Sequence, residues 1–496
     1  MTGGTGGIIL AFVLYLGAMI FIGWRYLKNN ETPTDFFLGG RKVGPWMTAL
    51  SAEASDMSGW LLMGLPGVAY LTGMKEAFWT AVGLTAGTYL NWLIVAKRLR
   101  KYTIHSNDSI TIPEFFTNRF KDSSRAIALV SVIFILIFFT IYTASGFVAC
   151  AKLFNSVFGL PYTVSLLLGI AVILAYTLLG GYLAVCATDF VQGSLMFVAL
   201  TLTAIVMIFS LGGPAEAAQR VSAFGSQFLN PFVSGPEDNF GPMAIVSALA
   251  WGLGYFGMPH ILVRFMGIRS NREITLSRRI ATVWVVIAFV GALMVGAFAK
   301  AYLLPETLAS GAEETVFVRS ILKMYPSFIA GLFLCGILAA AMSTADSQLL
   351  VASSAFSRDI FSGFLKKDAS DKTLLLVSRL TVLAVAAIAF VIALNPASSI
   401  FGLVSYAWAG FGATFGPLVL LSLFWKRTTR NGALAGLIAG GLTVILWKPL
   451  KGGIFDLYEI VPGFAVCLAV AVVVSLATRN DPAVEAEFDS YAKLED

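Results

Sequence analysis

The sequence predicts an all-α polytopic membrane protein with about 13 transmembrane helices. Two observations lead to this prediction. Of the 496 residues, 57% are hydrophobic and only 12% are charged, which is about half the charged share of a soluble domain. The apolar residues also fall into runs of about 20, the length of a helix that crosses a bilayer. One water-soluble core cannot bury so much apolar surface, so we expect lipid to cover part of it.

Thirteen runs satisfy this length, and the basic residues between them predict an orientation. The runs lie near residues 7–26, 45–70, 76–96, 126–151, 161–181, 189–212, 242–262, 280–304, 326–356, 374–394, 399–425, 432–449 and 456–478. With the N-terminus outside, 26 of the 34 basic residues fall in inside segments, among them Arg264–Arg279, and 8 fall outside. Cytoplasmic segments are enriched in Lys and Arg. We therefore expect the N-terminus outside, the C-terminus and the acidic tail 479–496 inside, and no nucleic-acid partner.

The composition also argues against an enzyme. The sequence has two histidines, His105 and His260, which leaves little scope for a histidine-ligated metal or histidine-based catalysis. Its four cysteines show no C-x-x-C spacing, so neither a zinc site nor a disulfide framework is expected. The longest loops, about 213–241 and 305–325, are too short for an enzyme domain. We expect the function to lie within the helices.

Two of the predicted spans carry helix-breaking residues at matching places. The span 45–70 contains Gly64 and Pro66, and the span 242–262 contains Gly257 and Pro259. Proline removes a backbone donor and glycine adds conformational freedom. A freed carbonyl in hydrocarbon costs several kcal/mol, so such a break is expected to line a cavity or meet a ligand. Two ordinary kinks are the alternative, since membrane helices are rich in Gly and Pro.

Paired broken helices in two halves of a chain indicate a transporter with inverted repeats. Each broken span here is the first of a block of five. Repeat one would cover about 45–212 and repeat two about 242–425 of a single membrane domain, a five-plus-five core. The first helix, 7–26, would be peripheral, and two C-terminal helices would cover 432–478.

Carboxylates within the spans are costly to bury and are therefore candidate functional groups. Asp56 and Glu53 lie one helical turn apart, Asp189 starts the sixth span, and Asp346 lies in the ninth. We expect no Lys or Arg within a span to pair with them, so a bound cation would neutralise the site. Oxygen donors suit hard ions, and the few formal charges favour a monovalent one. Sodium is the favoured ion, and a proton relay is the alternative.

Hydroxyl groups near Asp346 could complete such a site. Ser343, Thr344 and Ser347 follow the glycine- and alanine-containing run 336–341, which permits close backbone approach. An isolated Ser/Thr pair usually serves helix–helix packing. The neighbouring carboxylate favours an ion site instead.

At these residues the chain resembles the sodium/solute symporter family. The resemblance extends over nearly all predicted spans and is most specific in Ser55–Gly67, Phe138–Tyr142, Trp251–Gly257 and Leu403–Gly412. It implies a LeuT-like five-plus-five inverted-repeat core with flanking helices in a bacterial cytoplasmic membrane. It also implies sodium-driven uptake of a small solute by alternating access, with L-proline as the favoured solute.

The resemblance further implies roles for individual residues. It assigns sodium to the backbone carbonyls or hydroxyls of Ala54, Met57, Ala340, Ser343 and Thr344, with Asp56 as the coupling carboxylate. It assigns the solute to Ser58, Trp60, Gly64, Tyr142, Trp251, Tyr255 and Pro259. A second cation site or relay would involve Asp189, Asp346, Ser347 and Glu53, of which Glu53 replaces a glycine of the family pattern.

The chemistry of proline agrees with these aromatic positions. Trp and Tyr faces can cover its apolar ring and attract its ammonium group, and exposed amides of a broken helix suit its carboxylate. An interfacial aromatic belt is the alternative interpretation of the same residues. Another solute (a different amino acid, pantothenate, a sugar or sialic acid) is an alternative within the family, and a passive channel or membrane-embedded enzyme is one outside it.

Overall fold

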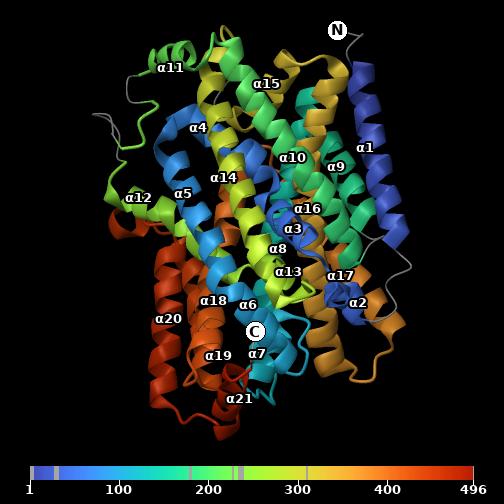
Figure 1. Ribbon diagram of the computed structural model, residues 1–496, viewed down its shortest axis with the longest axis vertical. Coiled ribbons are helices and arrows are strands. Elements are labelled where there is room, and N and C mark those ends of the chain that lie inside the picture. Colours follow the sequence, from blue (N-terminus) through green and yellow to red (C-terminus); the bar gives the residue numbers. More distant parts are fainter. Residues whose placement is uncertain are drawn as a thin grey trace.

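The computed structural model describes residues 5–26, 33–177, 181–225, 228–232, 240–308 and 311–494, and these residues are helical almost throughout (Figure 1). Parts of the predicted loops 213–241 and 305–325, and the ends of the span 161–181 and of the tail 479–496, lie outside them. Within the described residues the one β contact is an isolated bridge between Val43 and Ile268.

The α-helices are α1 (Thr5–Tyr26), α2 (Pro33–Leu38), α3 (Pro45–Gly59), α4 (Leu65–Thr72), α5 (Met74–Leu90), α6 (Ala96–His105), α7 (Ile112–Arg119), α8 (Ala126–Phe158), α9 (Tyr162–Thr177), α10 (Tyr182–Ser210), α11 (Pro214–Ser222), α12 (Pro242–Leu249), α13 (Pro259–Gly267), α14 (Asn271–Tyr302), α15 (Val316–Met324), α16 (Ser327–Ser354), α17 (Asp371–Ala393), α18 (Ile400–Phe424), α19 (Arg430–Trp447), α20 (Ile460–Ala477) and α21 (Pro482–Ala492). The π-helical turns are Trp60–Gly64, Asn91–Val95 and Ala355–Leu365. The 3-10 segments are Gly39–Arg41, Ala250–Gly257, Glu313–Thr315 and Gly453–Asp456.

Within the described ranges, nine helices are long and apolar enough to cross a membrane, or ten if the bent pair Pro242–Gly257 and Pro259–Gly267 forms one span. The chain is thus an all-helical, multi-pass protein. Every one of the 13 predicted runs contains helix, but those near 45–70 and 76–96 are divided by π-helical turns, and α9 has only 16 residues. The count of 13 spans therefore stays a prediction.

Several helices extend well beyond their apolar runs. α8 ends at Phe158 instead of near 151, and α10 begins at Tyr182 instead of near 189. α14 begins at Asn271, about nine residues before the predicted start. Hydropathy marks the length of chain that lipid tolerates, whereas helical hydrogen bonding also continues where the chain packs against protein, as the buried residues Tyr182 and Val185 of α10 do. The predicted limits were therefore too narrow at these ends.

The helices divide into a buried centre and an exposed periphery. In the apolar stretches of Ser327–Leu365 and of α18, 83% and 89% of the residues are buried, against 28% in both α17 and α20. α16 packs against α1, α3, α8 and α10, while α18 packs against α8 and the segment Ala250–Gly257. α1 lies at one edge of the molecule and α20 at another, with α18 between α20 and α8 (Figure 1). The central helices therefore hold the residues that can form a site.

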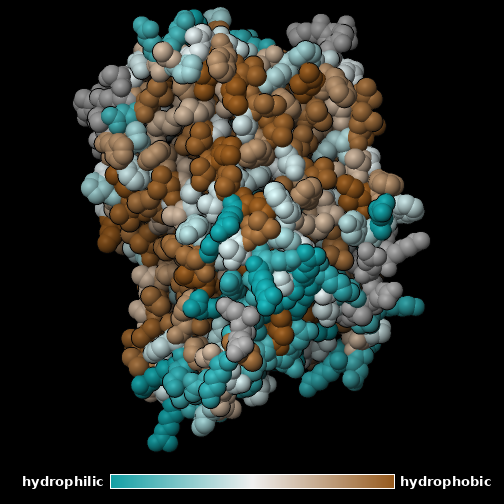
Figure 2. Space-filling model, viewed as in Figure 1, coloured by the Kyte–Doolittle hydropathy of each residue, from teal (hydrophilic) through white to brown (hydrophobic). Residues whose placement is uncertain are grey.

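One end of the molecule is markedly hydrophilic. Figure 2 shows apolar residues over the upper and middle parts of this face and hydrophilic residues gathered at the bottom, where α6, α7 and α21 lie in Figure 1. The tail helix α21 packs on this end: Tyr491 stacks on Tyr102 with ring centroids 3.9 Å apart, and Ser106 donates to Glu487 at 2.8 Å. The predicted acidic tail is thus docked along most of its described length.

Candidate functional site

The first helix break lies at Ser58, in the last turn of α3 and just before the π-helical turn Trp60–Gly64. Ser58 has φ 35° and ψ −174°, a backbone conformation that is costly for a residue with a side chain. Its hydroxyl accepts a hydrogen bond from the Trp60 backbone N–H at 3.1 Å. The break therefore comes earlier in the chain than the predicted Gly64 and Pro66, because Pro66 lies in the first turn of α4, where no backbone donor is needed.

The second break lies between α12 and α13. A 3-10 segment, Ala250–Gly257, follows α12, Met258 is extended, and the two parts meet at 46°. Gly254 is required here, since a Cβ on it would lie 2.0 Å from the Trp408 Nε1 atom. Both predicted spans are therefore broken, the second near Gly257 and Pro259 as expected and the first at Ser58, ahead of Gly64 and Pro66.

Side chains satisfy the carbonyls that these breaks release. Tyr142 donates its hydroxyl to the Asp56 carbonyl at 3.1 Å. Asn91 donates to the Tyr255 carbonyl at 2.9 Å, and Trp408 donates to the Trp251 carbonyl at 2.7 Å. Broken backbone within a membrane is tolerated only with such partners or at a cavity.

The Asp56 carboxylate joins the two breaks. Its Oδ2 atom accepts a 2.6 Å hydrogen bond from the Tyr255 hydroxyl. Its Oδ1 atom is buried and has no hydrogen-bond partner among the described residues. A buried carboxylate with a free oxygen favours a cation or a proton nearby.

Small oxygen-bearing groups gather where α16 crosses α3. The Ser343 hydroxyl donates to the Ala54 carbonyl at 2.7 Å and lies 3.4 Å from the Ala340 carbonyl. The Thr344 hydroxyl is buried and makes no hydrogen bond within the described part of the chain. The Met57 carbonyl accepts from the Trp60 N–H. Neutral oxygen donors of this kind suit a monovalent hard cation better than a divalent one.

A small cavity lies beside these oxygens. It is lined by Asp56, Met57, Trp60, Leu84, Tyr142, Trp251, Val404 and Trp408 and has a volume of about 10 Å³, roughly the space that one water molecule needs. The Trp60 and Trp251 rings close it, with centroids 5.1 Å apart. Three predicted solute residues (Trp60, Tyr142 and Trp251) thus line the cavity and Tyr255 contacts it through Asp56, whereas Ser58, Gly64 and Pro259 do not line it.

A larger pocket lies on the other side of Trp251. This pocket has a volume of about 310 Å³, and its lining includes Trp251, Phe401, Tyr458 and Glu459. The Phe401 ring stacks on Trp60 with centroids 6.0 Å apart, and it lies tilted against the Trp251 ring at 5.2 Å. Trp251 borders both spaces, so its side chain separates the outer pocket from the inner cavity. A solute the size of an amino acid would reach the inner cavity only after these aromatic rings move.

Arg264 corrects the expectation that no basic residue lies within the spans. It was assigned to a cytoplasmic segment, but it is buried on α13 and its guanidinium lies 3.2 Å from the Asp189 carboxylate. It also donates to Ser347 at 2.6 Å and to Ser51 at 3.1 Å. Ser51 in turn donates to Asp189 at 2.6 Å. The hydropathy pattern was misleading because Arg264 comes just after the apolar run 242–262, and a charged residue at such a position usually marks the end of a membrane span.

The remaining two candidate carboxylates lie apart from the cavity lining. Glu53 is buried and accepts a 3.3 Å hydrogen bond from the Trp92 indole N–H. Asp346 is buried next to Ser347, whose hydroxyl lies 3.4 Å from its Oδ1 atom. The residues predicted for a second cation site thus lie close to the Arg264 network, whereas Glu53 has a different partner.

Comparison with known proteins places the chain in a family. The model of the sodium:solute symporter family matches residues 36–440. The chain belongs to this family. The sodium/proline symporter of Escherichia coli is 49% identical over 464 residues, covering 92% of this chain and 90% of the relative. The high-affinity proline transporter PutP of Bacillus subtilis is 47% identical over 475 residues, covering 95% of this chain and 99% of the relative.

A solved structure agrees with the fold. A Na⁺-coupled sialic acid symporter in a substrate-bound outward-open state matches with a TM-score of 0.79 and 21% identity over 96% of this chain and 98% of that one. The apolar helices and the bacterial relatives together identify a multi-pass protein of the bacterial inner membrane. Membership of a transporter family also confirms the prediction of a transporter in place of an enzyme.

Sequence reasoning overlooked several side chains that build this symporter's site. Val404 and Trp408 lie in the stretch Leu403–Gly412, which carried the resemblance but received no role. Asn91 was a detectable signal, because an amide in the middle of a predicted span needs a partner. Trp92 and Arg264 gave no such signal, since their partners are distant in sequence.

Proposed function

We propose that this chain couples inward sodium movement to the uptake of L-proline by alternating access. The relatives named as sodium/proline symporters and proline transporters, at 45–49% identity, support this substrate and ion. The observation that carries the proposal is the junction of the two broken helices, where Tyr255 binds Asp56 beside the aromatic cavity.

The residues divide into an ion side and a solute side. Sodium would be held by oxygens of Ala54, Met57, Ala340, Ser343 and Thr344, with Asp56 as the coupling carboxylate. Proline would contact Trp60, Tyr142, Trp251 and Tyr255, with Ser58, Gly64 and Pro259 shaping the backbone around it. The second cation site at Asp189, Asp346 and Ser347 is a weaker proposal, because Arg264 already gives Asp189 a positive partner. Glu53 remains a candidate proton relay.

The arrangement explains how ion and solute would depend on one another. The Ser343–Ala54 contact joins α16 to α3, and the Asp56–Tyr255 contact joins α3 to the segment Ala250–Gly257. An ion that draws these oxygens together would orient Asp56 and so fix the position of Tyr255. Trp251 would then close over the solute, since it borders both the outer pocket and the cavity.

The proposed topology has 13 spans, the N-terminus outside and the C-terminus inside, with a five-plus-five inverted-repeat core embedded in lipid. Rocking of one repeat against the other would expose the site to each side in turn. One charge moving through about 100 mV supplies about 2.3 kcal/mol, which is roughly fiftyfold accumulation.

Uptake of radiolabelled L-proline into proteoliposomes tests the proposal. With an inward sodium gradient we expect accumulation above equilibrium, and with potassium in its place we expect none. Equal uptake in both conditions would reject sodium coupling. A competition panel of other amino acids, pantothenate, sugars and sialic acid would then identify the solute if proline is not accumulated.

Asp56 provides a second arm of that experiment. Asp56→Asn removes the charge and retains an oxygen for the Tyr255 hydroxyl, so the variant should fold yet lose sodium-stimulated uptake. Normal sodium-stimulated uptake by this variant would remove Asp56 from the mechanism. Proline binding measured at saturating sodium would separate a loss of ion affinity from a loss of solute affinity.

A further inference from the structure

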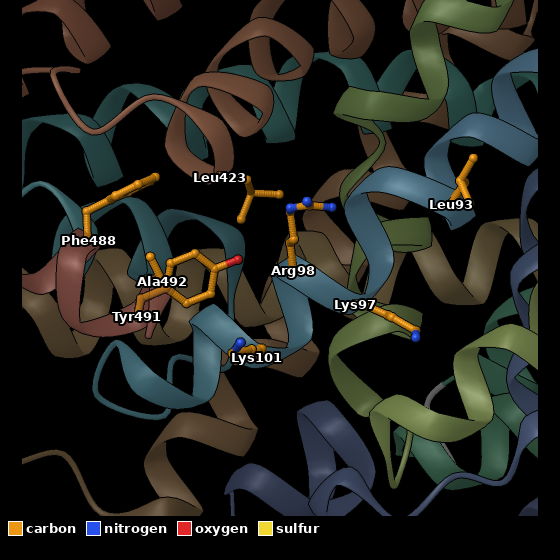
Figure 3. Close-up of a pocket in the computed structure, with 8 residues that line it drawn as sticks. All are labelled: Leu93, Lys97, Arg98, Lys101, Leu423, Phe488, Tyr491 and Ala492. Carbon is orange, nitrogen blue, oxygen red and sulfur yellow. The ribbon is translucent and has the colours of Figure 1, made fainter. Parts of the chain in front are cut away.

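A second pocket lies far from the ion and solute site, at the hydrophilic end of the molecule. It has a volume of about 310 Å³ and lies between α6, α18 and α21. Figure 3 shows its basic side chains arising from α6 and the aromatic side chains of α21 facing Arg98 across the gap. Its lining includes Lys97, Arg98, Lys101, Leu423, Phe488 and Tyr491.

The charge of this pocket is entirely positive. None of its lining residues is acidic, and neither Lys97 nor Arg98 forms an ion pair with a carboxylate in the described ranges. Arg98 lies 4.6 Å above the Phe424 ring and donates to the Ile94 carbonyl. Lys101 is already committed to the Leu494 carbonyl. Lys97 and Arg98 thus place two positive charges at this end of α6, where they would attract an anion.

The acidic residues of α21 do not neutralise these cations. Glu487 accepts from Ser106 and pairs with Lys121, and Asp489 lies 3.5 Å from Lys426. Glu485, the third acidic residue of the tail helix, accepts from Asn480 at 3.3 Å, so all three have other partners. Among the residues that the structure describes, no carboxylate therefore pairs with Lys97 or Arg98.

The pocket wall is rigidly supported. Arg119 is buried beneath α21, with its guanidinium 5.4 Å from the Tyr102 ring and 5.1 Å from the Phe488 ring. Its side chain also donates to the Val484 carbonyl at 3.3 Å. Tyr102 then stacks on Tyr491, which lines the pocket. These contacts hold α21 against α6 at the wall of the pocket.

Apolar side chains next to the cations indicate what kind of anion fits. Leu93 on the pocket wall is 39% exposed, and Phe424, under the Arg98 guanidinium, is 45% exposed. Both lie where the apolar helices give way to the basic segment of α6. A charged group bound here would have hydrocarbon-binding surface directly beside it, which matches a phospholipid and not a small soluble anion.

We propose that the pocket between α6, α18 and α21 binds the headgroup phosphate of an anionic phospholipid, with Lys97 and Arg98 as its ligands and Leu93 and Phe424 against its acyl chains. Basic pockets at the cytoplasmic ends of membrane helices are suited to such headgroups. A bound lipid would bridge α6 to the tail helix and would stabilise the docked position of α21. This site is independent of the proposed proline and sodium site.

Native mass spectrometry of the full-length protein tests the proposal. The detergent-solubilised protein is titrated with phosphatidylglycerol and with phosphatidylcholine of identical acyl chains. We expect selective retention of phosphatidylglycerol by the wild-type chain and roughly 10- to 30-fold weaker binding by the K97Q/R98Q variant, about fivefold for each lost cation. The K366Q/K367Q variant is the matched control: it removes two exposed cations elsewhere and should bind like wild type.

The remaining arms separate the alternatives. The K97R/R98K variant keeps both charges and should retain the lipid. Thermal unfolding with glycerol 3-phosphate or inorganic phosphate should show no shift, whereas a shift equal to that from phosphatidylglycerol would assign the pocket to a soluble phosphate and overturn the lipid proposal. Equal lipid binding by wild type and K97Q/R98Q, or equal loss in K366Q/K367Q, would also overturn it. Equal binding of phosphatidylglycerol and phosphatidylcholine by the wild-type chain would also overturn the proposal, and this measurement needs no variant.

Discussion

Replacing Arg264 by glutamine should destabilise the protein by about 3–5 kcal/mol, the usual cost of removing one partner of a buried ion pair. Neither Arg264 nor Asp189 has exposed side-chain surface, and their charged groups lie 3.2 Å apart. The substitution leaves the Asp189 carboxylate buried without its cation and also removes the bonds from Arg264 to Ser51 and Ser347. Asp189→Asn should have a similar effect, because the guanidinium then lacks its counter-charge.

The double variant D189N/R264Q should lose less stability than the two single variants together. Two neutral amides can hydrogen bond to each other, and no charge remains buried. We expect a coupling free energy of about 2 kcal/mol or more, toward the upper part of the range for residues in contact. Unfolding of the wild type and the three variants in the same detergent measures it.

An exposed ion pair provides the control for this double-mutant cycle. Lys426 and Asp489 lie 3.5 Å apart, and each side chain is 53% exposed. The K426Q and D489N cycle should give a coupling free energy below about 1 kcal/mol. If the Arg264 cycle gave a coupling of about 0.5 kcal/mol or less, or no more than the control, the argument that burial makes this pair indispensable would be refuted.

Three further predictions concern single residues. Ser343→Ala should raise the half-saturating sodium concentration about tenfold, equivalent to about 1.4 kcal/mol, because it removes the hydroxyl next to the Ala54 carbonyl; an unchanged sodium dependence of uptake would exclude Ser343 as a ligand. Trp251→Ala should raise the half-saturating proline concentration tenfold or more, as truncation of an aromatic anchor commonly does, and an unchanged value would count against the pocket. Burial opposes ionisation of Asp122, but hydrogen bonds from the Ile127 N–H and from Ser124 and Arg430 outweigh it and lower its pKa below the ordinary value of about 3.8. Because the pKa of Asp122 is lower in the folded than in the unfolded protein, its ionised carboxylate stabilises the fold at pH values above the ordinary pKa, and this stability is lost as the pH falls through the pKa of the folded state. The unfolding temperature of the wild type should therefore fall more steeply below about pH 4 than that of Asp122→Asn. Parallel curves would contradict this role.

Much of the site was accessible from local sequence pattern. Asp56 was identified because a carboxylate within a span is costly to bury and is therefore a candidate functional group, whereas Trp60 and Trp251 were assigned to the solute by the resemblance to the family. The position of the first break was less accurate. Proline and glycine indicate where a helix is easily interrupted, but the helical backbone is interrupted at Ser58. Tyr142 satisfies the Asp56 carbonyl that this interruption releases.

The sequence by itself determined that this protein is an all-helical membrane transporter, because hydropathy and helix-breaking residues depend on the local chain and its solvent. Only the tertiary structure decided which polar groups meet. Arg264 is 75 positions from Asp189, so no local pattern could pair them. Ser343 is 289 positions from Ala54, and before the structure only the family resemblance placed these two residues together. The burial of a charge depends on what packs around it, and the same arginine that resembles a loop residue in the sequence is a central buried cation in the fold.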